Sequence, residues 1–246
     1  MNITNKTVLI TGGGSGIGFQ VAKLLSSKNT VIITGRSEER LQKAAAQLNN
    51  VQYVALDVND DEGLDGLVAK ITNEYGKLDV LINNAGQAYV HKLDTRENTA
   101  KKAAEEIQTN YISIVSTIEK FLPLLSVQKE AAIVNVTSIV VFAPGINLPT
   151  YAASKAALHS YTRALRHTLK DTGIKVFELM PPLVNTELSK EIGGENGIAP
   201  EVVAQGLIDG FANDTYEIHV GNTADLYKVY LSSPEEALKV LNQGRG

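Results

Sequence analysis

Short runs rich in valine, isoleucine and leucine alternate along the chain with longer stretches in which apolar residues recur at helical spacing. Continuously apolar runs of this length are typical of strands that are buried on both faces of a sheet. The runs predict strands at Thr7–Thr11, Thr30–Thr34, Val51–Leu56, Leu78–Asn83, Ala132–Thr137, Ile174–Met180 and Glu217–Val220. The stretches between them predict helices near Ile17–Ser27, Glu38–Leu48, Asp60–Tyr75, Thr99–Leu125, Tyr151–Lys170 and Pro200–Asn213.

Alternating strands and helices are typical of βαβ units, whose right-handed crossovers build a parallel sheet covered by helices. We therefore expect an α/β fold with a Rossmann-type, doubly wound parallel sheet of about seven strands and helices on both faces. The 246 residues suit a single domain, 1–246, and the sequence shows neither a linker nor an internal repeat.

Two segments depart from this alternation. Residues 181–199 contain two prolines and three glycines, and a long irregular segment in a compact domain is often a lid over a substrate site. Residues 222–246 form a C-terminal tail in which Pro234-Glu-Glu resembles a helix start, and Gly244–Gly246 is expected to fray.

Composition narrows the function classes. A formal charge of −4 without a basic block argues against nucleic acid or an anionic membrane as the main partner. The absence of cysteine excludes disulfides and thiol nucleophiles and fits a reducing compartment. The strand pattern begins by Thr7, which leaves no room for a signal peptide, and no apolar run approaches the roughly 18 residues of a membrane helix. We expect a soluble, cytoplasmic protein.

A glycine-rich turn, Thr11-Gly12-Gly13-Gly14-Ser15-Gly16-Ile17-Gly18, follows the first predicted strand and precedes a helix. Glycines let the backbone approach a pyrophosphate closely, and the helix N-terminus favours its negative charge. The spacing is neither G-x-G-x-x-G nor a P-loop, and position 17 lacks the glycine of a hydrolase nucleophile elbow. A turn without a ligand is the alternative. The first βα position favours a dinucleotide contacted by Gly12, Gly14, Ser15, Gly16, Ile17 and Gly18.

The residue that reads the cofactor ribose normally follows the second strand, and an acid there binds the 2′-hydroxyl of NAD. Here the run is Thr34-Gly35-Arg36-Ser37, without an acid. The Arg36 guanidinium can instead pair with a 2′-phosphate, which favours NADP(H) over NAD(H). The alternative is that Arg36 is a solvated residue before a helix.

Tyr151 and Lys155 lie four residues apart in a predicted helix, so they share one of its faces. A free phenol has a pKa near ~10, and a nearby ammonium lowers it toward neutral pH. The pair therefore predicts a group that exchanges a proton with an alcohol or a carbonyl. The same spacing is common on exposed helices, so its meaning depends on the rest of the chain.

Five motifs in order resemble the short-chain dehydrogenase/reductase family over nearly the whole chain: the turn Thr11–Gly18, Asn83-Asn84-Ala85-Gly86, Thr109-Asn110-Tyr111, Ser138 after Val134-Asn135-Val136-Thr137, and Tyr151 with Lys155. Asp57-Val58 matches the family's adenine-contacting position. The family's P-G-x-V-x-T reads Pro181-Pro182-Leu183-Val184-Asn185-Thr186 here, a variant that resembles a bacterial oxidoreductase subgroup including DltE-like proteins. Because Pro182 fixes φ and removes a donor, we expect a different path for this loop.

The resemblance implies hydride transfer between a nicotinamide and a carbonyl compound or secondary alcohol, with Asn110, Ser138, Tyr151 and Lys155 as the catalytic set. Tyr151 is the implied general acid or base, Lys155 lowers its pKa and holds the ribose, Ser138 polarises the substrate oxygen, and Asn110 holds a water. The resemblance also implies a homodimer or homotetramer. The further implied cofactor contacts are Asp57, Val58, Asn84, Ala85, Gly86, Pro181, Val184 and Thr186.

The expected substrate walls are Tyr89, Val140, Phe142 and Leu183, beside Ser138. Near them the sequence places no arginine and only Lys190, between two acids, so we expect a largely uncharged small-molecule substrate. The alternative is a cation from the tail of another subunit, Lys239 or Arg245. The four histidines lack ligand spacing, so we expect no metal.

Two other functions remain open. A catalytically silent nucleotide-binding sensor or scaffold would need neither Ser138 nor Tyr151. Sugar-nucleotide epimerases share Y-x-x-x-K, but they resemble a longer chain with a different glycine spacing.

Overall fold

The protein is described by a computed structural model that covers residues 1–93 and 98–244. Residues 245 and 246 lie outside the described residues. This leaves out Arg245, the possible cation, and the last two residues of the segment Gly244–Gly246 that is predicted to fray.

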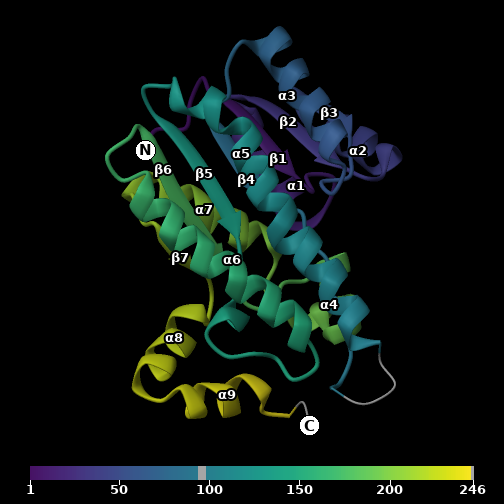
Figure 1. Ribbon diagram of the computed structural model, residues 1–246, viewed down its shortest axis with the longest axis vertical. Coiled ribbons are helices and arrows are strands. Elements are labelled where there is room, and N and C mark those ends of the chain that lie inside the picture. The colour runs from purple at the N-terminus through teal and green to yellow at the C-terminus, as the bar shows by residue number, and fades with distance from the viewer. Residues whose placement is uncertain (94–97, 245–246) are drawn as a thin grey trace.

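Seven parallel strands form one sheet in the order β3-β2-β1-β4-β5-β6-β7, which confirms the predicted doubly wound α/β fold (Figure 1). The strand order reverses beside β1, and ligands of such sheets bind at the carboxyl ends of the strands near that reversal. The strands are β1 Thr7–Thr11, β2 Thr30–Gly35, β3 Val51–Ala55, β4 Val80–Asn83, β5 Ala131–Val136, β6 Ile174–Met180 and β7 Glu217–His219.

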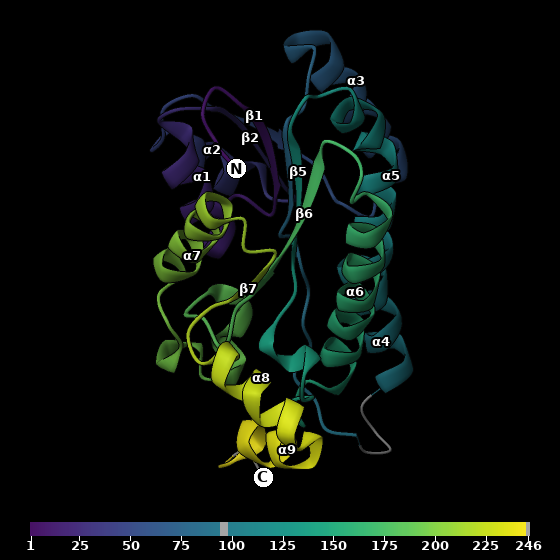
Figure 2. The same ribbon diagram turned by 90° about the vertical axis from the view of Figure 1, so that its left-hand side faces the viewer.

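Helices cover both faces of the sheet, as Figure 2 shows edge-on. One face carries α1 (Gly16–Ser26), α2 (Glu38–Ala45) and α7 (Pro200–Asn213), and the other carries α3 (Asp61–Tyr75), α5 (Ser113–Ser126) and α6 (Pro149–Thr168). Side chains of a strand alternate between the two cores, because successive residues point to opposite faces. In β1, Val8 and Ile10 enter the first core, whereas Leu9 enters the second.

The long predicted helix Thr99–Leu125 is interrupted. It consists of α4 (Thr99–Ile107), a π-helical turn at Gln108–Ile112 and α5. Such turns insert a residue into an α-helix and are frequent at functional sites. This turn contains Asn110, whose side chain is fully buried.

The C-terminal residues form two helices, α8 (Thr223–Ser232) and α9 (Pro234–Asn242), beyond the carboxyl ends of the strands (Figure 2). The helix start at Pro234 is confirmed, and Ser233 caps it by accepting from Glu236 N. The sequence did not predict α8. Asn242 attaches α9 to the preceding loop, because its side chain accepts from Ile146 N at 2.8 Å and donates to Pro144 O at 3.0 Å. Among the described helices, none combines the length and apolar character needed to cross a membrane.

Candidate active site

A cavity of about 710 Å³ lies where β1 to β6 end and extends from the glycine turn to α9. Each strand contributes the residues that follow its last one, so parallel strands gather distant parts of the sequence at one edge. The cavity is lined by the following residues singled out in the sequence: Gly12, Gly14, Ser15, Gly16, Ile17, Arg36, Asp57, Val58, Asn84, Ala85, Gly86, Ser138, Val140, Tyr151, Lys155, Pro181, Leu183, Val184 and Thr186. Gly18, Asn110, Tyr89 and Phe142 are not part of the lining.

The glycine turn is joined to the segment after β4. The Thr11 hydroxyl accepts from Asn84 N and Ala85 N at 3.0 and 3.1 Å, and the Asn84 side chain donates to Thr11 O and Gly12 O. Gly12 adopts φ +66°, and a Cβ at Gly18 would lie 2.5 Å from Gly12 O. Gly18 therefore permits close packing of α1 on the turn, and the turn's backbone faces the cavity.

The far end of the cavity, beyond β2 and β3, is polar and exposed. Arg36 and Arg40, which follow β2, line this end, and so does Asp57, which follows β3. Ser37 caps α2 by accepting from Arg40 N at 3.3 Å, and Asp57 accepts from Asn59 N at 3.0 Å. Arg36 forms no ion pair with any described residue, so its charge is available to an anionic ligand.

Asn110 fixes the backbone beside the cavity rather than lining it. Its side-chain oxygen accepts from Gln87 N at 2.8 Å, and its amide donates to Gln87 O at 2.8 Å and to the Ser154 hydroxyl at 2.9 Å. Ser154 in turn donates to Tyr151 O at 2.7 Å. The π-helical turn thereby ties the segment after β4 to α6.

Ser138, Tyr151 and Lys155 come together at the end of β5. Lys155 Nζ donates to Val136 O at 2.8 Å and lies 5.8 Å from the centre of the Tyr151 ring. The Ser138 hydroxyl forms a hydrogen bond with the Tyr151 phenol. Helix α6 therefore presents a phenol and an amine to the cavity, the amine at Val136, the last residue of β5, and the phenol at Ser138, two residues further on.

Burial dominates the proton affinities of this pair. It raises the pKa of Tyr151 to about 12, although the hydrogen bond with Ser138 acts in the opposite direction and nearby Glu106 adds to the rise. It lowers the pKa of Lys155 to about 8, against the charge of Glu178. Desolvation of the phenolate outweighs the other effects on the Tyr151 pKa, and the Lys155 amine donates to Val136 O. That Lys155 lowers the Tyr151 pKa stays a prediction.

Sequence reasoning missed a buried carboxyl group beside this pair. Glu106 in α4 is fully buried, and one of its carboxylate oxygens accepts from Tyr89 N at 2.7 Å, whereas the other has no hydrogen-bond partner among the described residues. Burial raises its pKa. In sequence, Glu105-Glu106 looks like a solvated helix face, so nothing distinguishes the buried residue. The Tyr89 phenol donates to Glu105 and accepts from Gln87, which occupies it outside the cavity.

Phe142 lies behind the cavity wall in an aromatic cluster. Its ring centre lies 4.7 Å from that of Tyr227, 5.6 Å from that of His219 and 6.0 Å from that of His159. Tyr227 belongs to α8, the helix that the sequence did not predict. The aromatic partner, not the cavity, sets the direction of this side chain.

Residues 184–198 form a closed segment over the cavity. Val184 pairs with Ile198, and backbone hydrogen bonds of 2.9 and 3.0 Å join Asn185 N to Ile198 O and Ile198 N to Leu183 O. Two short 3₁₀ helices, Glu187–Ile192 and Gly194–Asn196, lie between these ends. The buried Ser189 hydroxyl bonds Val184 O, which fastens the segment internally.

The end of the cavity near Tyr151 is largely apolar. Among the described lining residues, the cations are Arg36, Arg40 and Lys155. Lys190 does not line the cavity, and Lys239 pairs with Glu235 at 3.1 Å on the surface of α9. Within residues 1–93 and 98–244, no three His, Asp or Glu side chains gather as a metal site would require. The apolar lining consists of Ile139, Val140, Leu148, Pro182, Leu183, Leu188, Ile192, Ile198 and Leu241.

Comparison with known proteins gives consistent matches. Residues 6–197 match the family model described as short chain dehydrogenase. The chain is 42% identical over 226 residues to the uncharacterized oxidoreductase DltE of Bacillus subtilis, covering 89% of each chain. It is 30% identical over 209 residues to an uncharacterized oxidoreductase of Staphylococcus epidermidis, covering 84% of this chain and 89% of the relative.

Solved structures share the fold. A short-chain dehydrogenase from Burkholderia cenocepacia in complex with NADP superposes with a TM-score of 0.85 at 23% identity, covering 98% of each chain. A short-chain dehydrogenase/reductase from Burkholderia phymatum in complex with NAD has a TM-score of 0.83 at 22% identity, covering 89% of each chain. At these identities the superpositions establish the architecture.

Proposed function

Because this chain belongs to the short-chain dehydrogenase/reductase family, in its DltE-like subgroup, we propose that it transfers a hydride between NADP(H) and a largely uncharged carbonyl compound or secondary alcohol. One observation carries the proposal. The glycine turn, the segment after β4 and the Ser138–Tyr151–Lys155 group line a single cavity, which supports a site for a dinucleotide next to a small substrate.

The residues present fit a nicotinamide dinucleotide. The turn offers backbone at the N-terminus of α1 for a pyrophosphate, and the exposed Arg36 offers a guanidinium for a 2′-phosphate. No acid lines the cavity directly after β2, which favours NADP(H) over NAD(H). When bound, the cofactor supplies or accepts the hydride of the reaction. The other holding residues are Asp57, Val58, Asn84, Ala85, Gly86, Lys155, Pro181, Val184 and Thr186.

Tyr151 acts as the proton donor in the reducing direction. With a pKa raised to about 12, its phenol is protonated near neutral pH and donates to a developing alkoxide. Ser138 shares a hydrogen bond with that phenol and orients the same substrate oxygen. Lys155 contributes positive charge beside the phenol, and Asn110 holds α6 and the segment after β4 in register.

The substrate is proposed to be uncharged because the apolar end of the cavity offers no cation besides Lys155 among the described lining residues. A buried carboxylate or phosphate would need a paired cation, and removing an anion from water without one costs several kcal/mol. Val140 and Leu183 line this end. Tyr89 and Phe142 support it only from behind.

A panel of carbonyl compounds and alcohols tests the function. Each compound is mixed with NADP(H) or NAD(H), and the nicotinamide absorbance is followed. We expect turnover with NADP(H) on neutral apolar carbonyls and a clear disadvantage for matched anionic ones. Tight cofactor binding without turnover on any compound would instead support the silent sensor or scaffold.

The lid is a separate proposal. Residues 186–199 are expected to become more protected from hydrogen exchange when NADP(H) and substrate bind, because their side chains line the cavity. Equal, strong protection in both states would show a fixed loop. Homodimer or homotetramer formation and a cytoplasmic location are also proposed, and sedimentation and cell fractionation test them.

A further inference from the structure

Glu178 is a buried carboxylate in β6, the strand next to the edge strand β7. It is paired with Asn135 of β5 on one side and Glu217 of β7 on the other, and its side chain is 0% exposed. An isolated carboxylate is costly to bury, so it requires partners that compensate the loss of water. The strand is otherwise apolar apart from Lys175.

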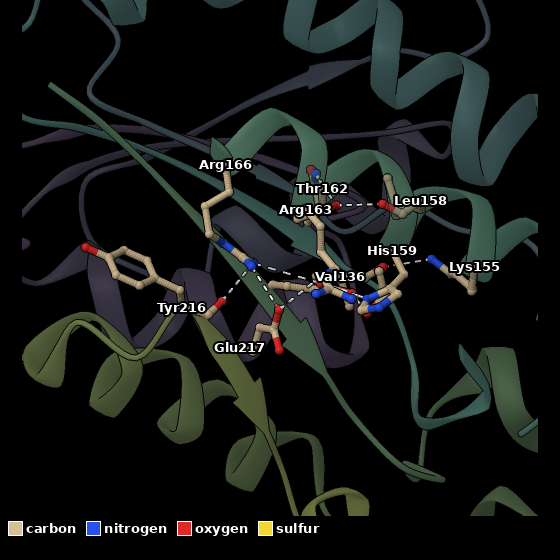
Figure 3. A network of polar contacts seen from close by, with 12 residues as sticks. Val136, Lys155, Leu158, His159, Thr162, Arg163, Arg166, Tyr216 and Glu217 are labelled. Atoms are coloured by element: carbon tan, nitrogen blue, oxygen red, sulfur yellow. Dashed lines mark hydrogen bonds and ion pairs between the residues drawn. The ribbon is translucent and has the colours of Figure 1, made fainter. Parts of the chain in front are cut away.

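Two elements supply those partners. The Thr137 hydroxyl donates to Glu178 at 2.7 Å from the end of β5. His159 Nδ1 lies 2.8 and 3.1 Å from the two carboxylate oxygens, and Arg166 lies 3.9 Å away, both on α6. Figure 3 shows His159, Arg166 and Glu217 of this network together with Lys155, a residue that lines the cavity. Glu178 thus joins the end of β5 to α6.

The same end of β5 holds the catalytic group. Three consecutive residues there contact three different partners: Val136 O accepts from Lys155, the Thr137 hydroxyl donates to Glu178, and the Ser138 hydroxyl bonds Tyr151. His159 follows Lys155 by one helical turn on the sheet-facing side of α6. The Glu178 contacts therefore fix both the strand end and the helix that must stay in register at the active site.

Charge reinforces this geometry. Burial lowers the pKa of Lys155, and the negative charge of Glu178 acts against that effect. Arg166 is drawn away by Glu217, to which it donates at 2.9 Å. The titratable and charged groups around the two residues are Tyr151, His159 and Arg166 on α6, Glu217 and His219 on β7, and Glu106 on α4 near Tyr151.

We propose that Glu178 is a positioning residue of the active site: through Thr137 and His159 it holds the end of β5 against α6, next to the carbonyl of Val136 to which Lys155 donates. The catalytic consequence rests on the proposed function, whereas the effect on Lys155 does not. Loss of the Glu178 charge should make Lys155 a stronger acid, because a nearby opposite charge favours the ammonium form.

The protonation of Lys155 is measured directly by NMR on protein carrying labelled lysine, with Lys155→Arg used for assignment. We expect the titration midpoint of Lys155 to move to lower pH in Glu178→Gln, because the neutral amide no longer favours the ammonium form. The matched control is Glu217→Gln, which removes a carboxylate of the same network that pairs with Arg166. It should leave the midpoint unchanged. An unchanged midpoint in Glu178→Gln would overturn the charge role.

Kinetics test the positioning role on the active enzyme. The alkaline limb of the kcat/KM profile should move to lower pH in Glu178→Gln and stay in place in Glu217→Gln. Thr137→Val keeps the charge and removes one bond, so kcat should fall while the Lys155 midpoint holds. Thr137→Val at full kcat would overturn the positioning role.

A second variant tests the positioning role in case Glu178→Gln does not fold. His159 is 19% exposed, so His159→Gln is tolerated more easily, and it should lower kcat with little change in KM for the cofactor. Unchanged kcat there would also refute the positioning role. Absence of turnover in the unmutated protein would contradict the proposed function alone, because the NMR titration still tests the effect of Glu178 on the protonation of Lys155.

Discussion

The two ends of the cavity are built from different parts of the chain. At the dinucleotide end, the backbone of the glycine turn and the exposed Arg36 form the surface. At the carbonyl end, side chains from β5, α6, residues 181–198 and α9 converge, and buried Glu106 and Glu178 lie behind them. The first end depends on local backbone conformation, whereas the second depends on tertiary packing and on the electrostatic effects of burial.

The largest expected effect separates chemistry from binding. Tyr151→Phe removes only the hydroxyl, so turnover should fall on the order of 10²–10⁴-fold while NADP(H) affinity stays nearly intact. Steady-state kinetics and cofactor titration measure the two quantities. A variant that kept the full rate on the true substrate would show that the carbonyl end works without this phenol.

Lys155→Met probes the cost of burying charge. Folding lowers the Lys155 pKa from 10.5 to about 8, so burying the ammonium reduces the free energy of unfolding. The whole of this reduction is present below pH 8, and it disappears as the pH rises from 8 toward 10.5. The variant should therefore be more stable than the unmutated protein at pH 7, by up to roughly 3 kcal/mol at 1.36 kcal/mol per pKa unit.

Urea unfolding at pH 7 and near pH 10 measures this difference, which should shrink at the higher pH. Arg36→Met is the matched control, because it removes a cation at the exposed end of the cavity. It should change stability little at either pH. A Lys155→Met variant no more stable than Arg36→Met at pH 7 would contradict the account of burial.

Arg36→Asp acts on the dinucleotide end alone. It should weaken NADP(H) binding by roughly 1.5–3 kcal/mol, the value of a charge-assisted hydrogen bond, and shift preference toward NAD(H). Titration of both cofactors into both proteins measures the change. Tighter binding of NAD(H) than of NADP(H) by the unmutated protein would reverse the assignment.

Leu241→Ala tests the smallest contribution, that of α9 to the carbonyl end. Leu241 lines the cavity and is partly buried. The substitution should weaken the binding of a bulky apolar carbonyl by about 1 kcal/mol, which appears as a higher KM, and it should leave cofactor affinity unchanged. Lys239→Ala on the exposed side of the same helix is the control. Equal effects of the two substitutions would remove α9 from the substrate site.

The same contrast explains what could be predicted from sequence. The strands, most helices and the residues of the glycine turn follow from local patterns, because continuous apolar runs and glycine spacing act within a few residues. The directions of Tyr89 and Phe142 do not. They depend on Glu105 and on Tyr227, which come close only after folding.

The buried acids differ in how visible they are in sequence. Glu178 is an acid within an apolar strand, a pattern that indicates a buried charge with partners. Glu106 sits in a helix of mixed charge and gives no such signal. The pKa of Tyr151 could not be predicted either, since the spacing of Tyr151 and Lys155 says nothing about how far both are removed from water.

The strand order has a consequence for the route by which the chain folds. β1 is made first but ends in the interior of the sheet, between β2 and β4, and parallel pairs of distant segments are slow to form. During synthesis β1, β2 and β3 can pair as soon as residue 55 has left the ribosome, whereas the other edge of β1 stays unpaired until β4 has been made. The catalytic group needs β5, α6 and β6 in addition. We therefore expect the dinucleotide half to order first on the nascent chain, and the capacity for catalysis to appear only in the last steps of folding.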